Sequence, residues 1–318
     1  MTQSPNVLEL VCADFAPALD LLRGLGLRLD SIYPADDPHT AMLSRDGQVI
    51  RLTARPDAPP PSAATCAFRP EFILTRAGEE GGEGRAGMHY RDLIPGRLGG
   101  RYIASHIRIA QGGPVADWVH FHRIAVQLIV VRKGWVRVVY QRQGAPFVME
   151  AGDMVVQPPG IRHRVLESGD GLEVVEITAP ALHETFADHE LVLPDPAGVD
   201  PAWTFGGQHF LHHVAAAALW QDWHGGEAQA SGVRAATGLA DARIIRPGAA
   251  TTIDIPAHDG ELVFGFVLEG AARLGFAGEH ALGPADAFVI PLGERWRLSG
   301  ASPDFRLLHV TTDRPQGI

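Results

Sequence analysis

The sequence predicts a mainly β protein that contains two β-barrels and a small α+β module at its N-terminus. Residues 128–160 and 264–293 share one order of apolar runs, glycines and prolines, which indicates two copies of the same β unit. Turns rich in glycine and proline separate these runs, as is typical of antiparallel structure. The helical pattern that we identify lies within the first 56 residues.

The N-terminal module is expected to span residues 1–56 in the order strand, helix and two strands. Residues 7–12 predict the first strand. Residues 15–27 predict a short helix, because apolar residues recur at positions 15, 19, 22 and 25 and a glycine ends the pattern. Residues 40–52 predict a hairpin whose turn is Asp46-Gly47.

This order resembles one half of the glyoxalase, or vicinal-oxygen-chelate, fold. The resemblance implies metal ligands of the histidine and glutamate type from paired half-modules. Glu9 is the one plausible carboxylate here and no histidine accompanies it on the first strand, so we interpret the module as structural. A half-module leaves sheet edges uncovered, and it should therefore pack on the barrels or pair with a second copy in a homodimer.

Three segments divide the rest of the chain. A proline-rich stretch at residues 57–64 and a glycine-rich stretch at 79–87 predict a linker over residues 57–87. A third break follows Leu193. We therefore expect a metal-binding barrel over residues 88–195 and a second barrel over 196–318.

The densest group of chemically active residues runs from His120 to His163. His120 and His122 are two residues apart and face the same side of a strand. Gln127 lies an odd number of residues from His122, so a bulge or bend must bring it to that side. His163 follows a turn at Pro158–Gly160 that starts a new strand. This arrangement predicts a metal site inside a small β-barrel.

These residues resemble the two signature motifs of the cupin superfamily. The matching positions are His120, His122, Gly134, Gly152, Pro158, Gly160 and His163. The chain departs from the motifs at Gly113, which is displaced by one residue, at Gln127, where glutamate is usual, and at Glu167, where asparagine is usual. The resemblance implies a double-stranded β-helix, or jelly roll, and a metal held by His120, His122, Gln127 and His163.

The C-terminal copy repeats the strand and turn pattern without the ligands. Alignment on the shared glycines and prolines places Pro256, His258, Val263 and Trp296 at the four ligand positions. One histidine does not hold a metal, so the chain resembles a bicupin with one metal-binding cupin and one degenerate cupin. We interpret Trp296 as a residue that fills the space of a metal, and a ligand-binding tryptophan is the alternative.

Three neutral imidazoles suit one divalent transition metal per chain, and the residues do not choose among iron, manganese, nickel, cobalt, copper and zinc. Iron(II) is favoured because three-histidine cupins of the dioxygenase type use it. Gln127 cancels no metal charge, whether it binds the ion directly or hydrogen-bonds a bound water. The site should therefore favour a small anionic, chelating substrate.

Three further residues are candidates for substrate binding. Arg137 is expected either to face inward and pair with the anion or to be solvated. Tyr140 is expected to line the barrel, with simple wall packing as the alternative. His106 lies on the first cupin strand. His183 and Glu184 begin an incomplete metalloprotease-like pattern, which we interpret as a polar loop.

Composition bounds the partners and the location. The net charge of −10 and the absence of a basic stripe argue against nucleic-acid binding. No apolar stretch is long enough to span a bilayer, and the N-terminus does not read as a signal peptide, so we expect a cytoplasmic protein.

Three functions agree with these features. We expect a metal-dependent cupin enzyme of the dioxygenase type, an oxidoreductase that acts on a small organic anion. A metal-dependent isomerase, lyase or hydrolase of the cupin class is the first alternative. The second alternative is a non-catalytic cupin that binds or senses a small molecule.

Overall fold

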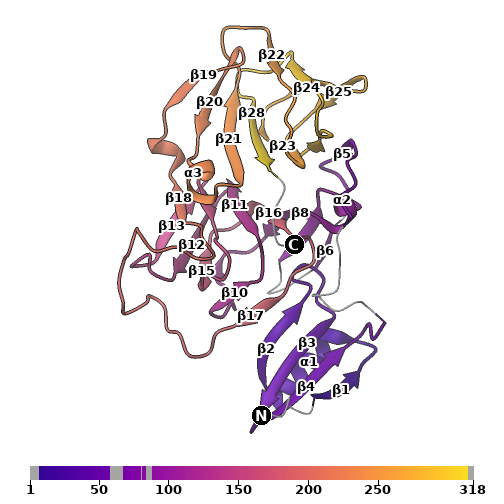
Figure 1. Ribbon diagram of the computed structural model, residues 1–318, viewed down its shortest axis with the longest axis vertical. Coiled ribbons are helices and arrows are strands. Elements are labelled where there is room, and N and C mark those ends of the chain that lie inside the picture. Colours follow the sequence, from indigo (N-terminus) through magenta and orange to yellow (C-terminus); the bar gives the residue numbers. More distant parts are fainter. Residues whose placement is uncertain (1–6, 58–66, 80, 84–87, 314–318) are drawn as a thin grey trace.

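A computed structural model describes residues 7–57, 67–79, 81–83 and 88–313. They form mostly β strands in three units, an N-terminal module, a central sandwich and a C-terminal sandwich, which follow one another from bottom to top in Figure 1. This confirms the predicted mainly β class. Among the described residues, each sandwich consists of two separate sheets and not of one closed barrel.

The N-terminal module is a four-stranded sheet with one helix. Its sheet runs β1-β4-β3-β2, with β1 parallel to β4 and the hairpin turn at Asp46-Gly47, where both residues have positive φ. The helix is three residues shorter than predicted. Strand β2 was not predicted from the sequence, and it pairs with β3 on one side and β17 on the other. The elements are β1 (Val7–Val11), α1 (Phe15–Gly24), β2 (Arg28–Tyr33), β3 (Thr40–Arg45) and β4 (Gln48–Thr53).

Strand β2 joins the module to the central sandwich. Its residues Ser31 and Ile32 pair with Phe186 and Thr185 of β17, so one sheet runs from the module into the sandwich. The β2 edge of the module's sheet is therefore covered by β17 of the same chain.

The central sandwich encloses the segment that carries the histidine motif. Its outer sheet contains β17 (Thr185–Ala187), β10 (His120–His122), β15 (His163–Ser168), β12 (Trp135–Tyr140), β13 (Phe147–Glu150) and, beside β15, β9 (Gly113–Pro114). Its inner sheet runs through β18 (Leu211–His213), β14 (Met154–Val156), β11 (Val126–Lys133), β16 (Leu172–Ala179), β8 (Ile103–Ile109), β7 (His89–Asp92) and β6 (Gly82–Glu83).

The C-terminal sandwich has the same design. Its inner sheet runs through β19 (Trp220–Trp223), β20 (Gly226–Ala230), β21 (Ala240–Arg246), β28 (Arg306–Thr312), β23 (Leu262–Glu269), β26 (Ala287–Val289) and β5 (Ile73–Thr75). Its outer sheet runs through β22 (Thr252–Ile255), β27 (Trp296–Ser299), β24 (Ala272–Gly275) and β25 (Glu279–Leu282). The short helices are α2 (Arg97–Gly100), α3 (Val233–Thr237) and the 3₁₀ helix η3 (Ala215–Ala217).

Two strands cross the domain boundaries that the sequence predicts. Strand β5 lies inside the predicted linker 57–87, yet it pairs with β26 at the edge of the C-terminal inner sheet (Figure 1). Strand β18 lies inside the predicted second barrel, yet it pairs with β14 of the central sandwich. Local composition does not reveal such long-range pairings. Residues 58–66, 80 and 84–87 of the predicted linker lie outside the described residues.

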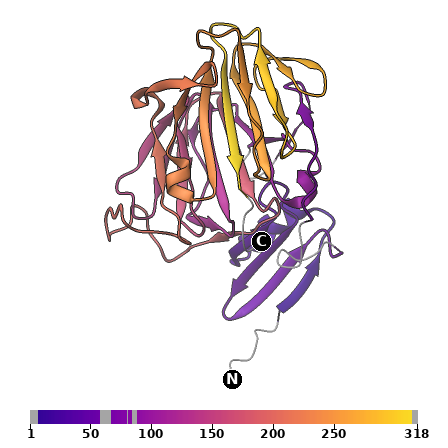
Figure 2. The same ribbon diagram turned by 45° about the horizontal axis from the view of Figure 1, so that its top comes forward.

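The two inner sheets pack face to face, with their strands side by side in Figure 2. Leu128 and Val130 of β11 face the C-terminal sandwich, whereas Ile129 and Val131 face the interior of the central one. Because both faces are buried, these strands are continuous apolar runs without alternation. On β23, Gly265 is required because a Cβ there would lie 2.2 Å from the Phe288 ring.

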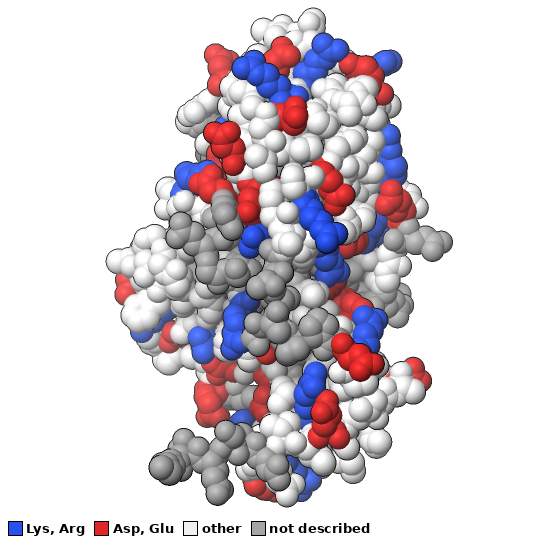
Figure 3. Space-filling model, turned by 45° about the vertical axis from the view of Figure 1, so that its right-hand side comes forward, with Lys and Arg blue, Asp and Glu red and all other residues white. Residues whose placement is uncertain are grey.

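The surface carries mixed charge. On the face shown in Figure 3, acidic and basic side chains are interspersed over the units. No helix within the described residues is both long and apolar enough to cross a membrane.

A buried polar network lies between the sandwiches. The His106 ring packs edge-on against Phe266, and its Nε2 donates to Glu173 Oε2 at 2.8 Å. Arg132 pairs with the same carboxylate oxygen. Arg91 donates to the carbonyl oxygen of Ala285 in the C-terminal sandwich at 2.7 Å. The network satisfies polar groups that would otherwise be costly in this interface.

These contacts shift two pKa values. The hydrogen bond from His106, with help from Arg132, lowers the pKa of Glu173 to about 2. Burial lowers the pKa of His106, because it disfavours the imidazolium more than Glu173 favours it. In the folded protein Glu173 is therefore ionised and His106 is neutral.

We predict that Glu173→Gln lowers the free energy of unfolding by about 2 kcal/mol at pH 7. The pKa of Glu173 is depressed by folding, so its contribution is present above about pH 4.5 and is lost as the pH falls toward 2. Urea unfolding at several pH values should show the two proteins converging in acid. Glu167→Gln, which removes the exposed partner of Arg137, is the control and should cost less than about 1 kcal/mol. A difference that is constant from pH 7 to 3 would contradict the assignment.

Candidate metal centre

Two antiparallel strands bring the histidines together. His120 of β10 lies directly opposite His163 of β15, and His122 follows two residues later on the same face. All three are buried: His120 is 1% exposed, His122 8% and His163 4%. One potential ligand atom of each lies within 4.8 Å of the others, which is close enough for a single metal ion.

The other nitrogen of each ring is held by a hydrogen bond. Nδ1 of His120 lies 2.7 Å from the carbonyl oxygen of Trp118, and Nδ1 of His163 lies 3.1 Å from that of Ile161. Nδ1 of His122 lies 3.0 Å from the hydroxyl of Thr185. A carbonyl oxygen accepts only from a protonated Nδ1, so the Nε2 atoms of His120 and His163 carry the lone pairs. This is the tautomer that a metal requires.

Asp117 adds a carboxylate behind the triad. Its Oδ1 lies 3.5 Å from Nδ1 of His120, and its Oδ2 accepts a hydrogen bond from the backbone N–H of Val165 at 2.9 Å. The Asp117 side chain is 1% exposed. A buried carboxylate beside a ligating imidazole orients the ring and increases its basicity.

Gln127 approaches from the facing sheet. The chain bends at residues 123–125 and passes from β10 in the outer sheet to β11 in the inner sheet, which is the bend that the spacing required. Gln127 is 1% exposed and lies on the same face of β11 as Ile129, which lines the cavity. Neither amide atom of Gln127 has a hydrogen-bond partner among the described residues. Buried polar groups normally have a partner, so the Gln127 amide is able to bind a metal ion or a metal-bound water.

The triad lies in a small cavity of about 90 Å³ inside the central sandwich. Most of the lining is apolar, as with Ile107, Ile129 and Val138. None of the described residues that line the cavity is lysine or arginine, and Asp36 and Glu176 are its two carboxylates. The metal would therefore be the principal positive charge in the cavity.

Tyr140 is the predicted substrate-binding residue that does line this cavity. Its ring stacks on His163 at 5.5 Å, and its hydroxyl accepts a hydrogen bond from Gln157 Nε2 at 2.6 Å. Burial raises the pKa of Tyr140, so the phenol keeps its proton. Because the oxygen accepts from Gln157, the O–H remains able to donate into the cavity.

The structure places Arg137 and His106 elsewhere. The Arg137 side chain is 44% exposed and pairs with Glu167 outside the sandwich, because alternation on β12 turns it away from Val136 and Val138. His106 lies on the β8 face that contacts the C-terminal sandwich. Neither residue lines the cavity. This geometry offers no contact between these two residues and a substrate.

His183 lies at the cavity and not on a solvated loop, which corrects our interpretation of it. It is 3% exposed, and its ring lies 5.4 Å from that of His122. Its Nδ1 lies 3.1 Å from the carbonyl oxygen of Pro180, so the neutral ring carries a lone pair on Nε2. That Nε2 is buried without a partner among the described residues.

The sequence analysis missed Asp36, Asp117, Gln157 and Glu176. Asp117 lies three residues before His120, and this spacing was the one available signal. Glu176 interrupts the apolar run of β16, where a charged residue in a doubly buried strand is informative. Asp36 enters from the N-terminal module and pairs with Arg97 of α2, and nothing local in the sequence indicates this.

The corresponding positions of the C-terminal sandwich differ. Trp296 is 3% exposed and packs edge-on against Phe288 at 5.2 Å. In the described part of this sandwich, no group of histidine, cysteine, aspartate or glutamate side chains converges as the triad does.

Comparisons with known proteins identify the fold. No family model matches the sequence, and no curated protein matches it. Among solved structures, the chain is similar to protein Ylba from E. coli, of family DUF861, with a TM-score of 0.56 and 11% identity over 80% of this chain and 96% of that one.

Two oxalate decarboxylases are also similar in structure. The Lactobacillus farciminis enzyme, solved as a formate complex, matches with a TM-score of 0.55 and 13% identity over 81% of this chain and 90% of that one. The Bacillus subtilis enzyme at pH 4.6 matches with a TM-score of 0.53 and 12% identity over 78% and 77%. At these identities the likeness shows the fold alone, which is of the cupin type.

We predict that Asp117→Asn weakens metal binding by about 10- to 100-fold, because the amide lacks the charge that supports His120. Competition with a chromophoric chelator would measure the affinity for zinc and iron(II). Asp170→Asn is the matched control, because this carboxylate accepts from the backbone N–H of Gly112 at an exposed turn. The His120→Ala, His163→Ala double variant should retain no bound metal. Unchanged affinity in Asp117→Asn would show that the Asp117 charge does not support His120 as a metal ligand.

Proposed function

We propose that the protein is a cupin-type, metal-dependent enzyme that holds one divalent ion through His120, His122, His163 and Gln127. The observation that carries this proposal is the convergence of three buried imidazoles whose Nδ1 atoms are all engaged. Iron(II) is the favoured ion, with manganese, nickel, cobalt, copper and zinc as alternatives. When bound, iron(II) would supply the redox chemistry of a dioxygenase.

The cavity supports a substrate with one anionic, chelating head group and an apolar body. An anionic head needs a cation, and no described lining residue is lysine or arginine. Apolar side chains such as Met149, Val165 and Leu172 would surround the rest of the molecule. A second carboxylate would lie among these residues without a cation and near the carboxylates of Asp36 and Glu176, at a high desolvation cost. A dianion as small as oxalate therefore fits this cavity poorly.

Three side chains of the cavity have roles in this proposal. Tyr140 donates its O–H to an oxygen of the substrate head group, while Gln157 fixes the direction of that donor. His183 presents a lone pair on Nε2 that accepts a proton or a hydrogen bond from the substrate. The apolar walls exclude water, which strengthens each of these interactions.

A lyase is the second candidate, because two of the similar structures are oxalate decarboxylases. The same residues would then bind a carboxylate substrate and move a proton without consuming oxygen. The non-catalytic binding protein of the sequence analysis is the third possibility. Oxygen consumption separates the first candidate from the other two.

The deciding experiment is a screen of β-diketones, catechols and 2-oxo acids with apolar bodies against the iron(II)-loaded protein in an oxygen electrode. Consumption of oxygen by the iron form and not by the zinc form is expected for a dioxygenase. Product formation by the zinc form without oxygen would favour the lyase. Binding of these compounds with no product in either form would favour a binding protein.

The remaining architecture is also a proposal. We propose that the two sandwiches form a bicupin with domains 88–195 and 196–318, and that residues 1–56 represent a glyoxalase-like half-module. A homodimer, a cytoplasmic location and the absence of nucleic-acid and membrane partners stay predictions. Sedimentation of the purified protein would test the dimer.

We predict that Gln127→Glu tightens metal binding and raises the Michaelis constant for an anionic substrate. The new carboxylate attracts the ion at short range in a nearly dry cavity and removes net positive charge from it. Metal competition and steady-state kinetics would measure the two effects. Gln143→Glu, at a turn outside the cavity, is the matched control. If Gln127→Glu leaves both constants unchanged, Gln127 does not act at the metal.

A further inference from the structure

The C-terminal sandwich has its own pocket of about 210 Å³ at the place that corresponds to the metal centre. In the central sandwich, Gln127 pairs with Thr178 on neighbouring strands. In the C-terminal sandwich, Val263 pairs with Thr311 at the equivalent register, and both line this pocket. By the same register, His309 corresponds to Glu176 and Arg243 corresponds to Ser105.

His309 is the buried polar group of this pocket. It is 5% exposed, and its Nε2 has no hydrogen-bond partner among the described residues. Leaving such an atom without a partner is costly, so its presence in a pocket points to a ligand.

The charged and titratable groups around His309 are Arg243, His258 and His224, together with the carboxylate of Asp241. Burial and the charges of Arg243, His258 and His224 lower the pKa of His309 to about 3. His309 is therefore neutral at pH 7, and the guanidinium beside it is positive. A negatively charged ligand group would stabilise this cluster.

Arg243 is positioned to bind that group. One edge of its guanidinium pairs with Asp241, and its face lies 5.2 Å from the centre of the Trp223 ring. Asp241 is its one hydrogen-bond partner within the described part of the chain. A guanidinium has five N–H donors, so Arg243 keeps donors for a ligand while Asp241 and Trp223 hold its orientation.

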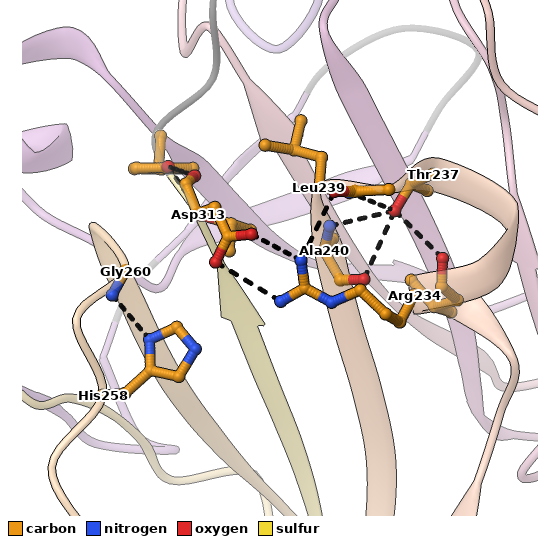
Figure 4. A network of polar contacts seen from close by, with 11 residues as sticks. Arg234, Thr237, Leu239, Ala240, His258, Gly260 and Asp313 are labelled. Atoms are coloured by element: carbon orange, nitrogen blue, oxygen red, sulfur yellow. Dashed lines mark hydrogen bonds and ion pairs between the residues drawn. The ribbon is translucent and has the colours of Figure 1, made fainter.

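Two lining residues of the pocket, Arg234 and His258, make the contacts drawn in Figure 4. Arg234 pairs with the carboxylate of Asp313 through both of its terminal nitrogens. His258 accepts a hydrogen bond from the backbone N–H of Gly260 at its Nδ1, at 2.8 Å. Because Nδ1 accepts, the proton of the ring is on Nε2, which is a further donor. Arg234 and Arg243 are each paired with one carboxylate, and Arg243 is the one that lies directly opposite His309 on the neighbouring strand.

Part of the pocket wall is apolar and aromatic. The ring centres of Trp223 and Trp296 each lie 5.6 Å from that of His309. Ile255 and Pro256 complete this surface. Aromatic walls of this kind suit a planar, apolar ligand body.

We propose that the C-terminal sandwich binds a small carboxylic acid with a flat apolar body, an aromatic or unsaturated acid, at a site separate from the metal centre. The carboxylate binds Arg243 and His309, and the body packs between Trp223 and Trp296. This site needs no metal and does not depend on the function proposed for the central sandwich.

The test uses 4-fluorobenzoate, followed by fluorine NMR, with the metal-loaded protein and with the His120→Ala, His163→Ala variant. We expect saturable binding that the triad variant retains, because the site does not use the triad. Arg243→Met and His309→Phe should each weaken that binding by about tenfold or more. Arg246→Met is the matched control: it lies on the same strand, pairs with Glu227 and contacts Trp220, and it should bind as the wild type does.

Two competitors test the chemical class. Neutral 4-fluorobenzyl alcohol should bind about tenfold more weakly than the acid. Equal affinity for the alcohol would overturn the carboxylate assignment, and equal competition by inorganic phosphate would overturn the need for an apolar body. Loss of binding in the folded triad variant would assign the ligand to the metal centre instead. Unchanged binding in both Arg243→Met and His309→Phe would also overturn the proposal.

Discussion

The antiparallel register between β10 and β15 places His120 opposite His163, and the site depends on this one alignment. Side chains of a strand alternate between the two faces of a sheet, so a slip of one residue would turn the imidazoles outward. The register is held from both sides, because β10 also pairs with β17 and β15 also pairs with β12. The strand that supplies Thr185 to His122 is itself held by β2 of the N-terminal module. The module therefore contributes to the order of the metal centre as well as to its cavity.

The chemistry of the central cavity follows from an imbalance of charge. Among the described residues, two carboxylates and no lysine or arginine line a small, mostly apolar space. The three histidines of the triad would not supply a fixed positive charge, because histidine binds a metal in its neutral form. Whatever anion enters must be balanced by the ion itself, and this is why the proposed substrate has one charged head group.

The two sandwiches show how one register supports two kinds of site. Residue pairs at equivalent positions of the inner sheets point into equivalent spaces. In the central sandwich these positions are Gln127 and Glu176, and Glu176 lines the cavity of the histidines. In the C-terminal sandwich they are Val263 and His309, and His309 lies beside two tryptophans. The backbone sets where side chains meet, and the identity of a few residues sets the chemistry.

The sequence by itself determined the mainly β class, the histidine motif and the absence of that motif from the second copy, because turn residues and strand periodicity act over a few positions. It also determined that Gln127 needs a bend to reach the site. Only the tertiary structure decided that β5 and β18 cross the expected boundaries, that His106 and Arg137 turn away from the cavity, and that Asp36 and His183 line it. These outcomes depend on pairings between residues far apart in the chain and on which face of each sheet is covered, and local sequence patterns carry no signal for either.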